Sequence, residues 1–229
     1  MTIHSKEVAD ARPVYPKISV PRTSVHESGL YRGAGKRFLD VAFVVLSAPF
    51  VLPVIIGLAI FLACQGVSPF YRQERVGKNG QIFKLLKLRT MVHDAETVLK
   101  KHLAANPDAQ DEWDRNQKLR NDPRIIKFGS FLRKSSLDEL PQFWNVLVGE
   151  MSMVGPRPMM VNQQDLYPGT RYYAMLPGIT GQWQVSKRNN SSFAERAHHD
   201  TEYWEKMSFS TDLNILMRTV SVVLRGTGC

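Results

Sequence analysis

Hydrophobic residues are concentrated in one long segment of this 229-residue chain. From Val41 to Cys64 the sequence has 24 uncharged, mostly apolar residues, and no charged residue occurs between Asp40 and Arg72. A helix needs about 20 such residues to cross the hydrocarbon core of a bilayer. The pattern therefore predicts a membrane-embedded helical segment.

Pro49 and Pro53 interrupt this apolar segment near its middle. Inside a helix, a proline removes one backbone hydrogen bond and clashes with the carbonyl group four residues earlier. We therefore expect a break or sharp kink at the prolines. The freed backbone groups would have to be satisfied by Ser47 or by packing within the protein.

Both flanks of the apolar segment are basic, with Arg32, Lys36 and Arg37 before it and Arg72, Arg75 and Lys78 after it. Basic flanks stay on the cytoplasmic side, so this distribution gives no preferred direction for a crossing. A re-entrant helix that enters, breaks and leaves on the same side accounts for both the prolines and the flanks. We favour this arrangement, over residues 31–68, above a kinked span and above a buried helix of a soluble protein.

The sequence after the apolar segment predicts shorter elements. Asn79-Gly80 is a strong hairpin signal between two short segments, so we expect antiparallel strands at about 70–76 and 81–88. Residues 94–120 are polar with scattered apolar positions, and Asn106-Pro107 divides them into two exposed helices.

An amphipathic helix is predicted near the C-terminus. Leu213, Leu216, Val220 and Leu224 recur there at spacings of three and four residues. We favour a helix that faces the core over one that lies on a membrane surface.

The remaining composition suits one domain with an appended tail. Residues 1–30 contain several prolines without apolar periodicity, which predicts a flexible tail, and residues 69–229 are long enough for one catalytic domain. The net charge of +9 favours a phosphate-rich partner such as nucleic acid, anionic lipid or a phosphorylated substrate. A nucleic-acid-binding protein has no use for the long apolar segment, so we expect no nucleic-acid partner.

The chemistry is expected between Phe131 and Pro158. Apolar residues at helical spacing predict a helix over about 139–148, and Pro141 requires that this helix begin close to Asp138 or Glu139. The two carboxylates would then lie at the positive end of a helix, which also attracts phosphate. Arg133 and Lys134 precede this pair, and Arg157 follows in a Pro-Arg-Pro sequence.

Carboxylates and fixed cations are the groups that phosphoryl transfer requires. A structural interpretation competes with this one, because Asp is a common N-cap and Glu is common in a first helical turn. Ser136 and Glu139 also fit a capping box, although that cap would place Pro141 too deep in the helix.

The chain resembles the bacterial sugar transferases, the small monotopic phosphoglycosyl transferases that start exopolysaccharide and O-antigen assembly, over about residues 31–226. The matching blocks are Lys36-Arg37 with Asp40, Phe70-Tyr71-Arg72-Gln73-Glu74-Arg75-Val76-Gly77, Phe83-Lys84 with Lys87, Arg89-Thr90-Met91, Ser136-Leu137-Asp138-Glu139-Leu140-Pro141-Gln142, Asn145-Val146, Gly149-Glu150-Met151-Ser152, Val154-Gly155-Pro156-Arg157-Pro158, Pro177-Gly178-Ile179-Thr180-Gly181 and Trp183-Gln184-Val185.

The resemblance implies an α+β, mostly helical fold: a re-entrant helix-break-helix in the membrane, with a break proline that matches Pro53, and a compact catalytic domain with a small β-hairpin. It implies that Asp138 attacks the sugar-linked phosphorus of a UDP-sugar and passes hexose 1-phosphate to polyprenyl phosphate. Glu139 would hold Mg²⁺, and Arg157 would grip a phosphate. Further phosphate- or substrate-binding candidates are Lys87, Arg89, Arg133 and Arg188.

The same resemblance implies a place for the protein in the cell. It would lie at the cytoplasmic face of the bacterial inner membrane, with both termini cytoplasmic and anionic lipids as neighbours; the family tolerates dimers. The transferred sugar stays open between galactose and glucose, with acetylated amino sugars behind them.

Several positions depart from the family pattern. Leu52 replaces a common Ser before the break proline, Leu176 replaces a common Arg, and Lys187 stands where the family has Gly. We assign no donor-binding role to Leu176 or Lys187.

Overall fold

The computed structural model describes residues 29–116, 119–186 and 193–224. Most of the predicted tail, residues 1–28, lies outside this part. A short π-helical turn, Tyr31–Gly35, leads into α1, a 29-residue α-helix at Lys36–Cys64. Among the described residues, Tyr31–Cys64 is the one helical stretch long and apolar enough to cross a membrane, and 6% of its most apolar part is buried in the protein. The predicted boundary between residues 31–68 and 69–229 stays a prediction.

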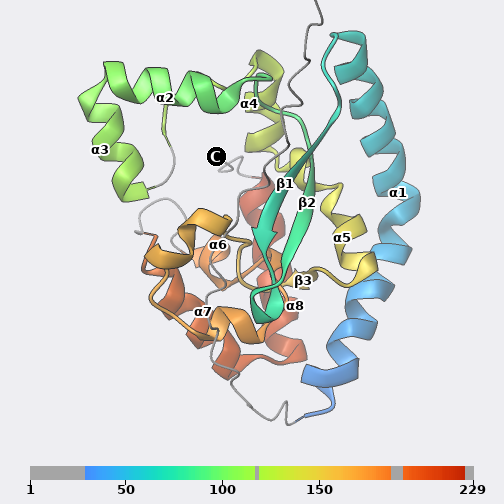
Figure 1. Cartoon of the computed structure of the whole chain (residues 1–229). Coiled ribbons are helices and arrows are strands. Elements are labelled where there is room, and N and C mark those ends of the chain that lie inside the picture. The colour runs from blue at the N-terminus through green and yellow to red at the C-terminus, as the bar shows by residue number, and fades with distance from the viewer. Residues whose placement is uncertain (1–28, 117–118, 187–192, 225–229) are drawn as a thin grey trace, which may run out of the picture.

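The prolines bend α1 without ending it. Pro49 and Pro53 both lie inside the helix, which bends near its middle along one side of the molecule (Figure 1). A proline removes one hydrogen bond but has a helical φ, so the helix can continue through it. Ser47 does not take the role that we expected, because its Oγ donates to the carbonyls of Phe43 and Val44 (2.8 and 3.1 Å). The carbonyls that lose their donors are those of residues 45 and 49.

The predicted hairpin and the two exposed helices are confirmed. Strands β1 (Phe70–Val76) and β2 (Ile82–Leu88) pair antiparallel, with Phe70 opposite Leu88 and Val76 opposite Ile82. Asn79 and Gly80 both have positive φ (59° and 74°), the conformation that an Asn-Gly turn provides. Helices α2 (Ala95–Ala105) and α3 (Pro107–Asn116) follow and meet at the predicted Asn106-Pro107 break.

The rest of the domain consists of short helices around a second small sheet. Strands β3 (Ser152–Val154) and β4 (Gly178–Thr180) pair parallel. The helices are α4 (Lys127–Lys134), α5 (Gln142–Val148), α6 (Gln182–Ser186), α7 (Arg196–Lys206) and α8 (Phe209–Leu224). Short 3₁₀ turns lie at Lys78–Gly80, Leu137–Glu139, Val161–Leu166 and Arg171–Ala174. The described residues are therefore mostly helical, with two small sheets, as the α+β prediction requires.

The orientation of α8 differs from the prediction. Ile215 is buried (2% exposed) and Leu216 packs partly buried against the core, as predicted, whereas Leu213 and Val220 are 47% and 55% exposed. The core-facing prediction is therefore wrong for Leu213 and Val220. The spacing of apolar residues showed that the helix is amphipathic, but Asp212 occupies part of the buried face and turns those two residues outward.

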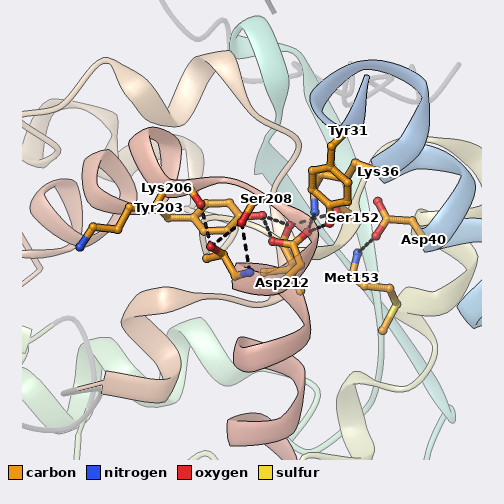
Figure 2. Close-up of polar contacts among 11 residues, drawn as sticks. Tyr31, Lys36, Asp40, Ser152, Met153, Tyr203, Lys206, Ser208 and Asp212 are labelled. Carbon is orange, nitrogen blue, oxygen red and sulfur yellow. Dashed lines mark hydrogen bonds and ion pairs between the residues drawn. The ribbon is translucent and has the colours of Figure 1, made fainter. Parts of the chain in front are cut away.

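A polar cluster attaches the start of α1 to the domain (Figure 2). Asp212, on α8, is buried and accepts hydrogen bonds from Tyr31 Oη (2.6 Å), Lys36 Nζ (2.5 Å) and Tyr203 Oη (2.6 Å). Asp40 accepts a hydrogen bond from the backbone N–H of Met153 (3.0 Å). Five side chains and one backbone N–H group thus hold the start of α1 against the domain.

Two arginines near the same end of the helix cap other helices. Arg37 donates to the carbonyls of Val146 and Leu147 at the C-terminus of α5 (2.5 and 2.8 Å). Arg32 donates to the carbonyls of Trp204 and Glu205 at the C-terminus of α7 (2.7 and 3.0 Å). Cations at these positions satisfy the last free carbonyls of a helix. The basic residues before the apolar segment are thus bound to the protein itself.

Candidate active site

Asp138 and Glu139 lie on a short turn between α4 and α5. The turn is a 3₁₀ helix at Leu137–Glu139, and Ser136 enters it with a left-handed backbone (φ 57°). The α-helix itself begins at Gln142 rather than at residue 139, because Pro141 lies directly ahead of it and the preceding bonds are of the 3₁₀ type. The carboxylates therefore precede the helix.

The capping interpretation of these residues is wrong. Neither Ser136 nor Pro141 makes a side-chain hydrogen bond that caps its helix. Glu139 instead turns toward two cations. Its Oε1 accepts hydrogen bonds from Lys87 Nζ (2.8 Å), on β2, and from Arg157 Nη2 (3.2 Å), which follows β3. Lys87 Nζ also lies 3.9 Å from Asp138 Oδ2. The structure thus brings four predicted site residues together.

Asn145 fixes the carboxylate turn against the hairpin. Its Oδ1 accepts a hydrogen bond from the backbone N–H of Leu86 (3.0 Å), and its Nδ2 donates to the carbonyl of Lys84 (2.9 Å). Both partners precede Lys87 by one to three residues on β2. The buried amide therefore sets the position of α5, and of the turn before it, relative to the Lys87 side chain.

Close backbone contacts between glycines determine the position of Arg157. A Cβ added to Gly178 would lie 2.1 Å from the backbone nitrogen of Gly155, and one added to Gly181 would lie 2.0 Å from the carbonyl oxygen of Gly155. These distances leave no room for a side chain. Two sequence blocks, 154–158 and 177–181, therefore form one contact of backbone against backbone. Arg157 extends from this rigid contact toward Glu139.

Asp138 is buried beside these charges, with a relative exposure of 6%. Burial raises the pKa of its carboxyl group above the ordinary value, and the charge of Glu139 acts in the same direction. Lys87, Arg133 and Arg157 oppose that rise. Burial lowers the pKa of Lys87, and the two carboxylates oppose that change. The ionised form of Asp138 thus depends on the cations around it.

The other predicted site residues have different positions. Arg133 Nε donates to Thr90 Oγ1 (2.9 Å), and its charge acts on Asp138. Arg89 donates to the carbonyl of Ser68 (3.0 Å) and stacks on Tyr71, so its side chain is engaged beside β1. Arg188 and Lys187 lie outside the described residues. Substrate-binding roles for Arg89, Arg133 and Arg188 stay predictions.

A metal ion would have few protein ligands here. Among the described residues, no group of three or more His, Cys, Asp or Glu side chains is arranged to hold one. Mg²⁺ is commonly bound by one or two carboxylates together with substrate phosphates, and Asp138 and Glu139 fit that pattern. Glu139 Oε1 already accepts from Lys87 and Arg157, so a bound ion would share this carboxylate with the two cations.

Two arginines near the site were missed by the sequence reading. The charges of Arg75 and Arg196 act on each other and on Arg157. Arg75 lies in one of the sequence blocks that support the family resemblance, and that position was a signal that it could belong to the site. Arg196 lies in none of the quoted blocks, and only the folded chain brings it close to Arg157.

Comparisons with known proteins found a family model and several similar proteins. A family model described as "Bacterial sugar transferase" matches residues 31–226. The UDP-galactose-lipid carrier transferase of Erwinia amylovora is 45% identical over 195 residues, which cover 84% of this chain and 41% of that protein. The exopolysaccharide production protein ExoY of Rhizobium meliloti is 42% identical over 211 residues, 88% of this chain and 92% of that protein.

A third relative is the UDP-glucose:undecaprenyl-phosphate glucose-1-phosphate transferase of Xanthomonas campestris pv. campestris. It is 33% identical over 224 residues, which are 90% of this chain and 43% of that protein. The chain thus spans less than half the length of two of these relatives and nearly all of the ExoY protein. Because the family match extends over almost the whole described chain, including the carboxylate turn and both glycine blocks, this chain belongs to the bacterial sugar transferases.

Proposed function

We propose that this chain is a phosphoglycosyl transferase of exopolysaccharide synthesis that moves hexose 1-phosphate from a UDP-sugar to undecaprenyl phosphate through a covalent aspartyl intermediate. The observation that carries the proposal is that buried Asp138 lies next to a second carboxylate, Glu139, with Lys87 close to both. Relatives named for transfer of a sugar phosphate to a lipid carrier support the same reaction class.

The reaction proceeds in two displacements at one phosphorus atom. First, a carboxylate oxygen of Asp138 attacks the phosphorus that carries the sugar. The bond from this phosphorus to the bridging oxygen breaks, and its electron pair leaves with the nucleoside monophosphate. In the second step, a phosphate oxygen of the polyprenyl phosphate attacks the same phosphorus. The bond to Asp138 then breaks, and the carboxylate is regenerated.

The surrounding side chains supply charge and orientation. Lys87 and Arg157 neutralise negative charge on the phosphate oxygens while they hold Glu139 in place. Glu139, together with phosphate oxygens of the donor, would hold Mg²⁺. The bound ion would withdraw charge from the transferring phosphoryl group.

Replacing Lys87 is expected to change the pH dependence of activity. Attack requires the ionised form of Asp138, so activity should rise as pH increases through the pKa of that group. Lys87 lowers this pKa, hence its loss raises the pKa further. We expect Lys87→Gln to shift the acidic limb of the kcat/KM profile to higher pH. Lys87→Arg, which retains the charge, should shift it less, and identical acidic limbs in all three proteins would contradict this role.

The exposed apolar surface supports a membrane setting. α1 presents many large apolar side chains to the outside, including Phe38, Leu46 and Phe50 at 72–78% exposure. Soluble proteins rarely expose so large an apolar surface. The surface continues onto α4, where Phe131 is 54% exposed, and onto α5, where Trp144 is 60% exposed. Phe128 of α4 packs against Phe61 of α1 (4.6 Å between ring centroids).

The carboxylate turn joins these two helices, α4 and α5. Asp138 would therefore lie close to the level of the lipid phosphates, where the headgroup of a polyprenyl phosphate is found. We accordingly propose that the catalytic residues act at the cytoplasmic face of the inner membrane.

We further propose that α1 is re-entrant, so that residues before and after it lie on the cytoplasmic side. The bend at the prolines and the attachment of residues Tyr31–Asp40 to the catalytic domain support this topology. A single cysteine introduced before residue 31, in a Cys64→Ser, Cys229→Ser background, should react with an impermeant maleimide only after the cells are opened. Labelling of intact spheroplasts from the periplasmic side would mean a true span.

Radiolabelled donor tests the reaction directly. We expect detergent-solubilised protein to form labelled lipid from polyprenyl phosphate, Mg²⁺ and one of a panel of UDP-sugars: UDP-galactose, UDP-glucose and the UDP-N-acetylhexosamines. Without the acceptor, intact-mass measurement should detect protein that carries hexose 1-phosphate. Absence of labelled lipid with every donor, from folded protein, would exclude the proposed function.

A further inference from the structure

Arg75 and Arg196 carry positive charge that no described carboxylate pairs with. The Nε atom of each guanidinium is shut off from solvent and has no hydrogen-bond partner among the described residues. Arg75 Nη2 donates to Gln73 Oε1 (2.6 Å), a neutral group. Arg196 stacks on Trp183 (4.2 Å to the ring centroid) and on Phe193 (4.5 Å). Neither arginine makes an ion pair with a described Asp or Glu within 4.0 Å.

Buried charge without a counter-ion is costly. Burial lowers the pKa of both groups, with a further contribution from Arg157, to about 10 for Arg75 and about 9 for Arg196. Both guanidiniums are therefore charged at neutral pH. Asp200 is the acidic residue that acts on Arg196, but burial raises its pKa to about 7, so about half of it is neutral near that pH.

Arg157 links these two arginines to the reacting carboxylates. It bonds to Glu139, and its charge acts on Arg75 and Arg196; Arg75 Nη1 also donates to the carbonyl of Pro158 (3.5 Å), the residue after Arg157. The cations nearest Asp138 have carboxylate partners, because Lys87 and Arg157 both bond to Glu139. Lys87 and Arg157 thus have carboxylate partners in direct contact, whereas Glu139 acts on Arg75 and Asp200 acts on Arg196 without an ion pair within 4.0 Å between them.

We propose that Arg75 and Arg196 bind the phosphate that leaves with the nucleoside, an assignment that rests on the proposed function. A nucleoside diphosphate sugar has two adjacent phosphates. When the sugar-linked phosphate lies at Asp138, the second phosphate extends past Arg157 toward the unpaired arginines. Two guanidinium forks match the oxygens of that phosphate, and its charge provides the missing counter-ion.

This binding would also assist the first chemical step. As Asp138 forms its bond to phosphorus, the bond to the bridging oxygen breaks and the electron pair stays on the nucleoside monophosphate. The negative charge on this leaving phosphate increases from donor to product. Cations fixed beside it stabilise that charge where it develops. In the second step these arginines have no role, because the nucleotide has left.

Uridine monophosphate (UMP) probes this subsite without turnover. We expect Arg75→Gln and Arg196→Gln each to raise the Kd for UMP by about 10-fold or more, since each loses a charge-assisted hydrogen bond. The Kd for uridine, measured by competition, should change by less than about twofold, because it has no phosphate. Transfer from preformed covalent adduct to polyprenyl phosphate should also be unchanged. Damage to the fold would weaken the binding of both UMP and uridine and would slow both half-reactions.

Arg32→Gln is the matched control. Arg32 also stacks on an aromatic ring, that of Trp204 (5.1 Å), and donates to backbone carbonyls, but it lies at the start of α1. Its loss should leave the Kd for UMP unchanged. Where a Gln variant does not fold, the Lys variant replaces it in the same assay. Lysine retains the positive charge but lacks the paired N–H donors of the guanidinium, so we expect a smaller rise in the Kd for UMP than in the Gln variant.

A UMP affinity within twofold of wild type in folded variants at both positions would overturn the assignment. This outcome differs from failure of the proposed function. Protein that forms labelled lipid but shows unchanged UMP affinity in the variants would refute the arginine assignment alone. Protein that binds UMP through both arginines but forms no labelled lipid would refute the transferase reaction and leave the nucleotide-phosphate subsite standing.

Discussion

Asp138→Asn is expected to abolish both lipid product and covalent adduct. The amide has nearly the same shape as the carboxylate but is a very poor nucleophile toward phosphorus. Loss of an attacking group that acts with its neighbours as a unit reduces kcat by about 10⁴- to 10⁶-fold. Labelled-lipid formation measures the loss of turnover, and the intact mass after donor exposure measures the loss of the adduct.

The stability of this variant separates catalysis from folding. The pKa of Asp138 is raised in the folded protein, so the native state binds the proton more tightly than the unfolded chain does. Stability therefore falls as pH rises through the native pKa, and ionised Asp138 is unfavourable for folding above it. An asparagine at this position carries no charge, so the variant lacks this unfavourable contribution to the free energy of folding. The Tm of Asp138→Asn above this pH should equal or exceed that of wild type, and a large fall would attribute the lost activity to misfolding.

Glu139→Gln is the matched control, because it neutralises the adjacent carboxylate. It leaves Asp138 available as nucleophile but removes the charge that Lys87 and Arg157 bond to. We expect slow turnover and an adduct that still accumulates. If the adduct formed in Asp138→Asn, or if it were lost in Glu139→Gln and not in Asp138→Asn, Glu139 rather than Asp138 would be the nucleophile.

The sequence predicted the local elements of this fold well. The Asn79-Gly80 turn, the two exposed helices and the long apolar segment each follow from short-range chemistry. Prediction was weaker where long-range contacts decide the outcome. Leu213 and Val220 fit a core-facing stripe, yet Asp212 is buried instead because three donors converge on it from distant parts of the chain.

The same division holds for the site. Asp138, Glu139 and Arg157 were found because they lie in one short stretch, and Lys87 because it lies in a block that the family shares. No local pattern could show that Lys87 and Arg157 meet on one oxygen of Glu139, or that Glu139 does not cap a helix. Arg196 is more than thirty residues from Arg157 in sequence, and its proximity depends on the packing of α7.

The basic residues before α1 illustrate a third case. Sequence reasoning used their charge only to orient the apolar segment relative to the membrane. In the structure, Lys36 ends in a buried ion pair, with side-chain exposures of 12% for Lys36 and 8% for Asp212. A charge on a flank can therefore hold a membrane segment against its own domain as well as set its orientation.

Asp212→Ala is expected to produce the largest loss of stability. It would leave Lys36 as a buried charge without its partner and would remove the acceptor of Tyr31 and Tyr203, which Figure 2 shows converging on this carboxylate. Breaking a buried ion pair on one side costs about 3–5 kcal/mol. Thermal unfolding in lipid nanodiscs should therefore show a marked fall in Tm, together with faster proteolysis near Gly35 as the start of α1 detaches.

Asp108→Ala controls for the helix dipole, because Asp108 and Asp212 both lie in the first turn of their helices. Asp108 is exposed, so its loss should change the Tm little. The double variant Lys36→Met, Asp212→Ala tests the cause more directly. If the cost comes from a buried unpaired charge, removing that charge should restore part of the lost stability, although Tyr31 and Tyr203 still lack an acceptor. Additive losses in the double variant would show that the two side chains stabilise the protein independently, and that the start of α1 is held by other contacts.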